Sequence, residues 1–345
     1  MQRPSLADAQ RVAARYGATG AVDLVAGGHI NESFRVEGAG GALLLQWLNP
    51  AVFPDPDAVQ DNVEAVLCHL EAKDPSAGWP GPVRTLDGAF RTLDATGLWR
   101  ALRWLPDRFQ IERPGDRHEA RCGAGGFARF VGALADFDPE RLHPVLPGFH
   151  DLTARLEAFD RALVQASATR RGKARAALES VLELREQHAQ GSEPPSYSRV
   201  IHGDTKFTNL LFAADRSTAL AVDYDTVMPG RLEWDFGDML RSAASTGAED
   251  DPAGGRVRDA ILEAAVLGYV DGLEGRLSSA ERRALPSAPA HMAFMLGVRF
   301  LTDFLVGDHY FRIRRPGQNL DRARHQFALA QALAQRADVI ARLLD

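Results

Sequence analysis

The hydrophobic pattern of the chain changes near Pro106, and this change restricts the fold more than any other feature. Before this residue, short apolar runs alternate with polar residues and are separated by glycine-rich turns, as in antiparallel strands. After it, apolar residues recur at helical spacing. The pattern predicts an α+β fold with a small antiparallel β lobe (residues 1–105) and a larger, mainly helical lobe (106–345). We expect ligands to bind in the cleft between two such lobes.

Local signals divide the first lobe into helices and strands. Ser5 and Asp8 form a capping-box pattern and Gly17 is a stop signal, so a helix is expected through about Tyr16. Residues 22–47 predict a three-strand meander, and two more strands are expected before Pro106. A helix near 57–72 has one apolar face, formed by Val59, Val63, Val66, Leu67 and Leu70.

The second lobe is expected to be helical apart from one hairpin. The hairpin joins "LLF" and "ALAVDYD" through the polar turn "AADRS". The segment 191–198, "GSEPPSYS", is expected to be a loop. Helices are predicted near 118–136, 151–166, 171–188, 256–274, 279–305 and 320–343.

Composition and charge exclude several classes of protein. The net charge is −6 with acids and bases interspersed, which argues against a nucleic-acid partner. No apolar run resembles a signal peptide or a membrane span, so we expect a soluble, cytoplasmic protein. The two cysteines, Cys68 and Cys122, provide neither a disulfide framework nor a metal-site spacing. The oligomeric state is left open.

The segment "VIHGDTKFTNLLF" (200–212) has the spacing of a phosphoryl-transfer loop. In kinases, a base Asp and a metal-binding Asn lie five positions apart in the pattern H-x-D-x-x-x-x-N, which Asp204 and Asn209 reproduce. Lys206 can neutralise charge on a γ-phosphate, and Asp223, after the next hairpin strand, can supply a second magnesium ligand. His202 is interpreted as a support for the backbone.

The tripeptide "DFG" at 235–237 is a false match to protein kinases, because no strand leads directly into it. Asp235 is therefore expected to cap or brace the following helix. Asp225 has two possible roles, since it could assist the metal or hold the loop.

Motifs along nearly the whole chain resemble the aminoglycoside phosphotransferase and choline kinase superfamily, and most closely its N-acetylhexosamine 1-kinase branch. They include "AGGHINESFRV", "LLLQWLN", "LPGFHD", "VDYDTVMPG" and "GVRFLTDFLVGDHYF". The resemblance implies a protein-kinase-like two-lobed fold, ATP, magnesium and phosphorylation of a sugar at its anomeric hydroxyl. By position, Asp204 matches the catalytic base and Asn209 and Asp223 the metal ligands. The positions that match residues near the sugar are His29, Asn31, Arg299 and Tyr310.

The nucleotide-binding part departs from the usual kinase pattern. Gln46 stands where the third strand of a kinase normally carries a phosphate-binding Lys, and we expect Glu64 or Asp61 to bond it. The glycine-rich loop keeps only Gly27 and Gly28. The segment "RWLP" should contact adenine through the backbone of Trp104 and Leu105, with the Trp104 ring facing away.

Three functions compete for this sequence. The first is an ATP-dependent sugar 1-kinase. The second is a kinase for an amino alcohol or aminoglycoside, whose cationic substrates need acidic or aromatic surroundings; an arginine at position 299 disfavours it. The third is a nucleotide-binding pseudokinase, which Gln46 favours and Asp204, Asn209 and Asp223 oppose.

Overall fold

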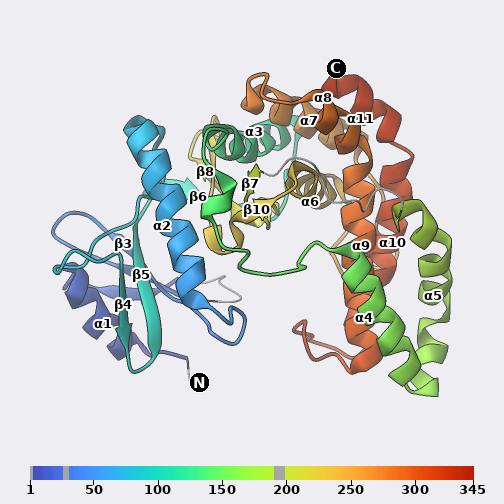
Figure 1. The fold of residues 1–345 in the computed structure, drawn as a ribbon, viewed down its shortest axis with the longest axis horizontal. Helices are drawn as coiled ribbons and strands as arrows, with labels where there is room; N and C mark the ends of the chain where they lie inside the picture. Colours follow the sequence, from blue (N-terminus) through green and yellow to red (C-terminus); the bar gives the residue numbers. More distant parts are fainter. Residues whose placement is uncertain (1–2, 26–30, 190–198) are drawn as a thin grey trace. The chain divides into compact units, whose positions relative to one another are not determined.

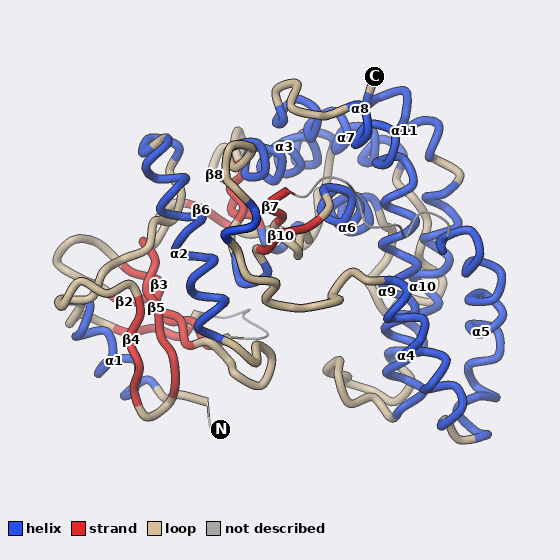
Figure 2. Tube along the Cα trace, in the orientation of Figure 1, coloured by secondary structure: helices blue, strands red, loops and turns tan. Residues whose placement is uncertain are grey.

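The computed structural model describes residues 3–25, 31–189 and 199–345, and its fold is drawn in Figures 1 and 2. The chain forms two compact units. The first combines Met1–Phe109 with Ala133–Pro147 and Val222–Pro229; the second combines Gln110–Gly132, Gly148–Ala221 and Gly230–Asp345. An antiparallel sheet forms the centre of the first unit, whereas most of the second is helical (Figure 2). The α+β fold class is therefore confirmed.

A five-stranded antiparallel sheet of order β1-β2-β3-β5-β4 forms the centre of the first unit. Strands β1 (Val22–Leu24), β2 (Glu32–Val36) and β3 (Leu43–Trp47) form the predicted meander. Strand β5 (Gly97–Arg103) lies between β3 and the edge strand β4 (Arg91–Asp94). The two-residue strand β6 (Arg108–Phe109), which follows the turn after Pro106, was not predicted.

One face of this sheet is apolar and packs against the first helix. Helix α1 (Leu6–Ala13) continues as a 3₁₀ turn to Tyr16 and ends before Gly17, whose φ is 71°. The predicted capping box is present, because Ser5 Oγ accepts from the Asp8 N–H at 3.2 Å and the Asp8 carboxylate accepts from the Ser5 N–H at 2.9 Å. The buried residues of this core are Ala9, Val12, Ala13, Tyr16, Ala18, Phe34, Val36, Leu45, Trp47, Trp99 and Ala101.

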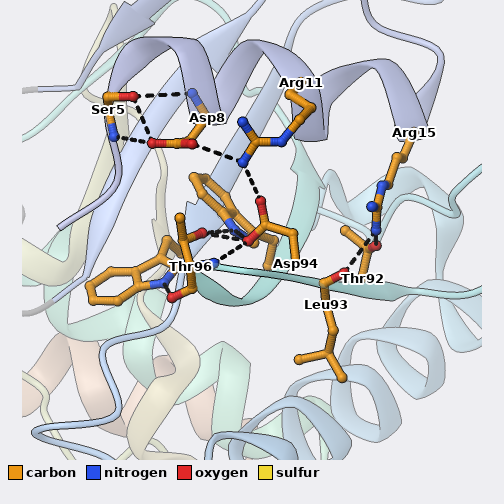
Figure 3. Close-up of polar contacts among 10 residues, drawn as sticks. Ser5, Asp8, Arg11, Arg15, Thr92, Leu93, Asp94 and Thr96 are labelled. Carbon is orange, nitrogen blue, oxygen red and sulfur yellow. Dashed lines mark hydrogen bonds and ion pairs between the residues drawn. The ribbon is translucent and has the colours of Figure 1, made fainter. Parts of the chain in front are cut away.

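Side chains from α1 also reach the edge strand β4 (Figure 3). Arg11 donates to the Asp94 carboxylate at 2.6 Å. Arg15 donates to the Leu93 carbonyl at 2.8 Å and to the Thr92 hydroxyl. The helix is thus tied to the sheet by polar contacts at its margin as well as by apolar packing.

The opposite face of the sheet is polar along one row. Ser33, Gln46, Arg100 and Arg91 are direct partners on successive strands, and direct partners project to the same face. Helix α2 (Pro56–Lys73) is capped by Asp55, which accepts from the Ala58 N–H at 3.0 Å, and the helix buries the predicted apolar stripe. Arg91 on β4 pairs with Asp61 of α2, so this helix is linked to the sheet.

The second unit contains the helices that follow the sheet, and most predicted helices are confirmed with shifted ends. They are α3 (Arg117–Ala133), α4 (Leu152–Gln165), α5 (Ala168–Ala189), α6 (Leu232–Ala244), α7 (Asp259–Leu273), α8 (Ser279–Ala284), α9 (Ala288–Val306), α10 (Gln318–Ala334) and α11 (Ala337–Leu344). The helix expected over 320–343 is divided at Gln335 and Arg336 into α10 and α11. Helix α9 contacts α4, α5, α6 and α10 and is buried along most of its length.

Short strands complete the fold. Strand β7 (Arg199–Ile201) precedes the segment 202–209, and β8 (Leu210–Ala213) pairs with β9 (Ala219–Ala221) as the predicted hairpin. Strand β10 (Met228–Gly230) was not predicted. The segment 191–198, expected to be a loop, lies outside the described residues.

Among the described residues, one helical stretch, Ser279–Val306, is long and apolar enough by composition to cross a membrane. In its most apolar window, 72% is buried inside the protein, which is the behaviour of a central helix in a globular fold. Its apolarity is thus explained by the helices packed around α9.

Candidate active site

The loop between β7 and β8 brings Asp204, Lys206 and Asn209 together in the second unit. Lys206 Nζ donates to Asp204 Oδ2 at 2.6 Å. The Asn209 amide nitrogen donates to the same carboxylate oxygen at 3.0 Å and to the Asp204 carbonyl at 2.8 Å. The local backbone allows this convergence, because Gly203 adopts a left-handed φ of 80° and Phe207–Asn209 form a 3₁₀ turn.

The electrostatics of the loop keep Asp204 ionised. Burial raises the pKa of this carboxyl, but Lys206, His202 and Asn209 together outweigh burial, so the pKa lies below its ordinary value. The Asp204 side chain retains 27% exposure. Asp204 is therefore a partly accessible carboxylate that can accept a hydrogen bond and a proton.

Buried groups support the backbone of this loop. The His202 ring is fully buried and lies edge-on to Phe127 and Phe130, at centroid distances of 5.5 and 5.6 Å. The Asp235 carboxylate accepts from the N–H groups of His202 and Gly203 at 2.7 and 2.8 Å. Asp235 lies within the first turn of α6, which begins at Leu232. It therefore does not cap a following helix; it braces the loop.

Burial has a cost at Asp235, since it raises the pKa of this carboxyl to about 7 although both backbone N–H groups lower it. A second contact from the same residue fixes the loop, because the Asp235 carbonyl accepts from the Thr205 hydroxyl at 2.6 Å. The loop is thus held by both the side chain and the backbone of one residue.

Sequence reasoning missed three buried polar residues near this loop. His150 Nε2 donates to the Gly203 carbonyl at 3.2 Å, and the residue is 6% exposed. Burial lowers the pKa of His150 to about 4, so this ring is neutral near pH 7. Asp238 and Arg241 form a buried ion pair of 2.7 Å in α6. Their i, i+3 spacing on a helix could have indicated the pair, whereas nothing local indicated His150.

Arg299 of α9 lies among aromatic rings. Its guanidinium carbon is 4.7 Å from the Phe149 ring centroid, 5.8 Å from that of Tyr310 and 5.5 Å from that of Phe311. Burial lowers the pKa of Arg299, and neighbouring Arg155 lowers it further. Tyr310 is 68% exposed. The predicted pair Arg299 and Tyr310 therefore lies together, and sequence reasoning missed the other two rings.

The turn that carries Tyr310 is held by one carboxylate. Asp303 Oδ1 accepts from the N–H groups of His309 and Tyr310 at 2.9 and 2.8 Å. Its Oδ2 accepts from the Phe311 N–H and the Asn319 amide, both at 2.9 Å. Asp303 is 4% exposed, so this single side chain satisfies four N–H donors inside the protein.

Other predicted residues belong to the first unit. Asp223 has a φ of 67°, a strained value for a residue other than glycine, and is exposed at the start of the 3₁₀ turn Tyr224–Thr226. Asp225 in that turn is 4% exposed, accepts from the Asn31 amide and pairs with Arg100. The approach of Asp223 to Asn209 stays a prediction.

Gln46 has different partners from those expected. Its amide nitrogen donates to Ser33 Oγ at 3.1 Å, and its oxygen accepts from Arg100 Nε at 3.0 Å. Asp61 pairs with Arg91 instead. The expected bond between Gln46 and an acidic residue of α2 is thus replaced by bonds along the sheet.

The segment expected to contact adenine is partly engaged within the first unit. The Trp104 N–H donates to the Ala42 carbonyl at 3.1 Å, and the Arg35 guanidinium lies 5.5 Å from the Trp104 ring centroid. The rings of Trp104 and the side chain of Leu105 are half-buried. Gly27, Gly28 and His29, also expected near ligands, lie outside the described residues.

The donors expected for magnesium suit that ion chemically. Asn209 is 4% exposed, and its amide nitrogen is bonded to Asp204, so its oxygen is the atom that can serve as a ligand. Asp223 offers an exposed carboxylate, and Mg²⁺ prefers such oxygen ligands. In the described part of the chain, no three or more His, Cys, Asp and Glu side chains are grouped to hold a metal ion. Magnesium bound to either residue would also take oxygen ligands from water or phosphate.

Similarity to solved structures defines the class of the fold. A spectinomycin phosphotransferase in complex with ADP and spectinomycin is 12% identical, with a TM-score of 0.64 over 97% of this chain and 100% of that chain. A choline/ethanolamine kinase family protein from Mesorhizobium loti is 17% identical, with a TM-score of 0.59 over 98% and 99%. A microcompartment-associated aminopropanol kinase is also 17% identical, with a TM-score of 0.57 over 98% and 99%. The chain therefore has the protein-kinase-like fold that these enzymes share.

The match to a protein family is more specific than the fold. Residues 22–273 match the phosphotransferase enzyme family. The chain belongs to this family, which confirms the superfamily predicted from the motifs along the chain.

Proposed function

We propose that this protein is an ATP-dependent kinase that phosphorylates the anomeric hydroxyl of an N-acetylhexosamine. The observation that carries the proposal is the bonding of Asp204 to Lys206 and Asn209, which keeps a partly exposed carboxylate ionised. An ionised, accessible carboxylate is what a general base requires. The resemblance to the N-acetylhexosamine 1-kinase branch supplies the acceptor.

In the proposed reaction, Asp204 accepts the proton of the acceptor hydroxyl. The acceptor oxygen bonds to the γ-phosphorus, the bond from this phosphorus to the β–γ bridging oxygen breaks, and ADP leaves. Lys206 is close enough to Asp204 to neutralise charge that develops on the transferred group. Asn209 and Asp223 would hold Mg²⁺, which when bound neutralises phosphate charge.

The choice of nucleotide is supported by similar structures. Two spectinomycin phosphotransferase structures contain ADP or AMP, and an aminoglycoside 2'-phosphotransferase structure contains GDP. We infer ATP as the donor for this chain, and GTP is the comparison to make.

The electrostatics around Arg299 favour a sugar over a cationic acceptor. Arg155 lowers the pKa of Arg299, and Arg155 donates to the Phe149 carbonyl beside the Arg299 cluster. A choline or aminoglycoside cation would be repelled by two guanidinium groups. A neutral N-acetylhexosamine can instead accept hydrogen bonds from Arg299 and stack on an aromatic ring.

A coupled assay of ADP release tests the proposal. Hexosamines, N-acetylhexosamines, choline and aminoglycosides are compared as acceptors, each with ATP and with GTP. Turnover with N-acetylhexosamines and ATP supports the proposal, turnover with cations alone favours the amino-alcohol or aminoglycoside alternative, and nucleotide binding with no turnover favours the pseudokinase.

A variant pair tests the base. Asp204→Asn should lower kcat by about 10²- to 10⁴-fold while nucleotide still binds. Asp215→Asn is the matched control, because Asp215 lies in the exposed turn of the following hairpin and accepts only from Ser217 among the bonds described. Equal activity of the two variants would remove Asp204 from the role of base.

A further inference from the structure

A buried arginine lies in the middle of the sheet of the first unit. Arg100 on β5 is 1% exposed, and its position directly opposite Gln46 places it on the polar face of the sheet. Burying an unpaired guanidinium is very unfavourable, so such residues are retained where their contacts offset that cost. The contacts of Arg100 therefore indicate what the residue does.

Arg100 joins the sheet to the turn that follows Asp223. Its Nε donates to the Gln46 amide oxygen at 3.0 Å, and its Nη2 pairs with the Asp225 carboxylate. Asp225 also accepts from Asn31, whose oxygen in turn accepts from the Asn49 N–H at 2.9 Å. Each of these residues belongs to the first unit.

One further donor of this arginine is not used in these contacts. Arg100 Nη1 is buried and has no hydrogen-bond partner among residues 3–25, 31–189 and 199–345. A buried donor without a partner costs free energy unless a bound group or water satisfies it. The Arg100 guanidinium can thus donate a further hydrogen bond beyond those to Gln46 and Asp225.

The arrangement differs from the usual kinase pair in the position of the charge. A kinase normally places a lysine on its third strand and pairs it with a glutamate of the following helix. Here the third strand carries neutral Gln46, and the cation stands one strand away and pairs with Asp225. The acidic residues Asp61 and Glu71 of α2 pair with other arginines, Arg91 and Arg103.

We propose that Arg100 is a positioning residue that replaces the missing strand lysine: by holding Asp225, it fixes the strained turn from which Asp223 would bind the magnesium of a bound nucleotide. This inference rests on the proposed function as far as the nucleotide and magnesium are concerned. It is independent of which acceptor is phosphorylated.

The test measures ADP binding by calorimetry with Mg²⁺ and again with a chelator. Loss of a residue that orients metal ligands typically weakens metal affinity by about 10- to 100-fold, so Arg100→Gln should weaken ADP binding by that factor with Mg²⁺. Without Mg²⁺ the change should be less than about threefold, because the ligand turn is then not engaged.

Three further variants make the result specific. Arg91→Gln is the control, since it removes an exposed arginine–carboxylate pair from the same cross-strand row and should leave both dissociation constants unchanged. Arg100→Lys keeps the charge but cannot contact Gln46 and Asp225 through two separate nitrogens, so an intermediate loss of ADP affinity with Mg²⁺ is expected. This variant serves as the readout should Arg100→Gln not fold. Gln46→Lys combined with Arg100→Gln moves the cation to the usual strand and should restore part of the magnesium-dependent affinity.

Wild-type magnesium-dependent affinity in folded Arg100→Gln or Arg100→Lys overturns the inference. Equal weakening with and without Mg²⁺ also overturns it, because the effect would then be a general loss of the nucleotide site. Normal magnesium-dependent binding by the wild-type protein without turnover of any acceptor removes the proposed kinase activity but leaves the role of Arg100 standing. Absence of such binding in the wild-type protein removes both proposals.

Discussion

Replacing Asp303 by asparagine tests whether one carboxylate holds the turn that carries Tyr310. An asparagine side chain keeps one oxygen and presents an NH₂ group in place of the other, so two of the four N–H donors would face a donor. A hydrogen bond to a charged group is worth about 1.5–3 kcal/mol. Loss of two such bonds therefore sets an upper range of about 3–6 kcal/mol.

The expected loss is smaller than this range. Tyr310 is 68% exposed, so water can reach part of the freed backbone. We expect the free energy of unfolding to fall by about 2–4 kcal/mol, measured by urea denaturation followed by circular dichroism. Because the turn carries two of the rings beside Arg299, KM for the sugar should rise about tenfold, which corresponds to about 1.4 kcal/mol, whereas KM for ATP should not change.

Asp74→Asn is the control for this prediction. Asp74 accepts from the Ser76 N–H at 2.9 Å at an exposed helix start, where asparagine caps equally well. Its effect should stay within about 0.5 kcal/mol. An Asp303→Asn protein with the unfolding midpoint and the sugar KM of the wild type would refute the reasoning.

Three other predictions concern packing, pH and the acceptor. A Cβ at Gly268 of α7 would lie 2.1 Å from the Arg121 carbonyl oxygen of α3, so Gly268→Ala should destabilise the fold by about 1–3 kcal/mol. At Gly172 nothing lies within 4 Å of the added Cβ, so Gly172→Ala should stabilise the fold by about 0.5–1 kcal/mol. Melting temperatures of both variants equal to that of the wild type would contradict both predictions. Burial lowers the pKa of His188 to about 4, whereas in the unfolded chain a histidine takes up a proton near pH 6.5. The free energy of unfolding should therefore fall as the pH drops from about 6.5 to 4. In urea denaturation at several pH values, His188→Gln should reduce this fall by up to about 3 kcal/mol. Arg299→Gln should raise KM for an N-acetylhexosamine by about tenfold or more, the equivalent of one charged hydrogen bond, while an unchanged KM in steady-state assays would exclude Arg299 from acceptor binding.

The elements that sequence predicts well are those with local signals. The capping box at Ser5 and Asp8, the stop at Gly17 and the apolar stripe of α2 each depend on residues within a few positions of one another. The grouping of Asp204 with Asn209 is similarly local, because six consecutive residues of one loop contain both. Such features are set by backbone geometry and nearby side chains.

Features that depend on distant partners were missed. A helix was expected only after Asp235, without bounds, whereas α6 begins at Leu232. A Cβ at Gly237 of α6 would lie 2.6 Å from the Ala288 carbonyl oxygen, so close packing against the start of α9 requires glycine there. Arg100 resembles any other strand residue until its partner Asp225, 125 positions away, is known. His150 acts on the Gly203 backbone across 53 positions. No pattern of residue spacing within a short segment predicts such pairs.

The contacts between α1 and β4 have a consequence for association between molecules. Strand β4 lies at the border of its sheet, where free backbone groups can recruit a strand from another chain, and Leu93 there is 62% exposed. Arg15 occupies the Leu93 carbonyl, and Arg11 places a cation at Asp94. The first helix therefore protects strand β4 from pairing with a strand of another molecule, and loss of the helix should increase aggregation through this edge.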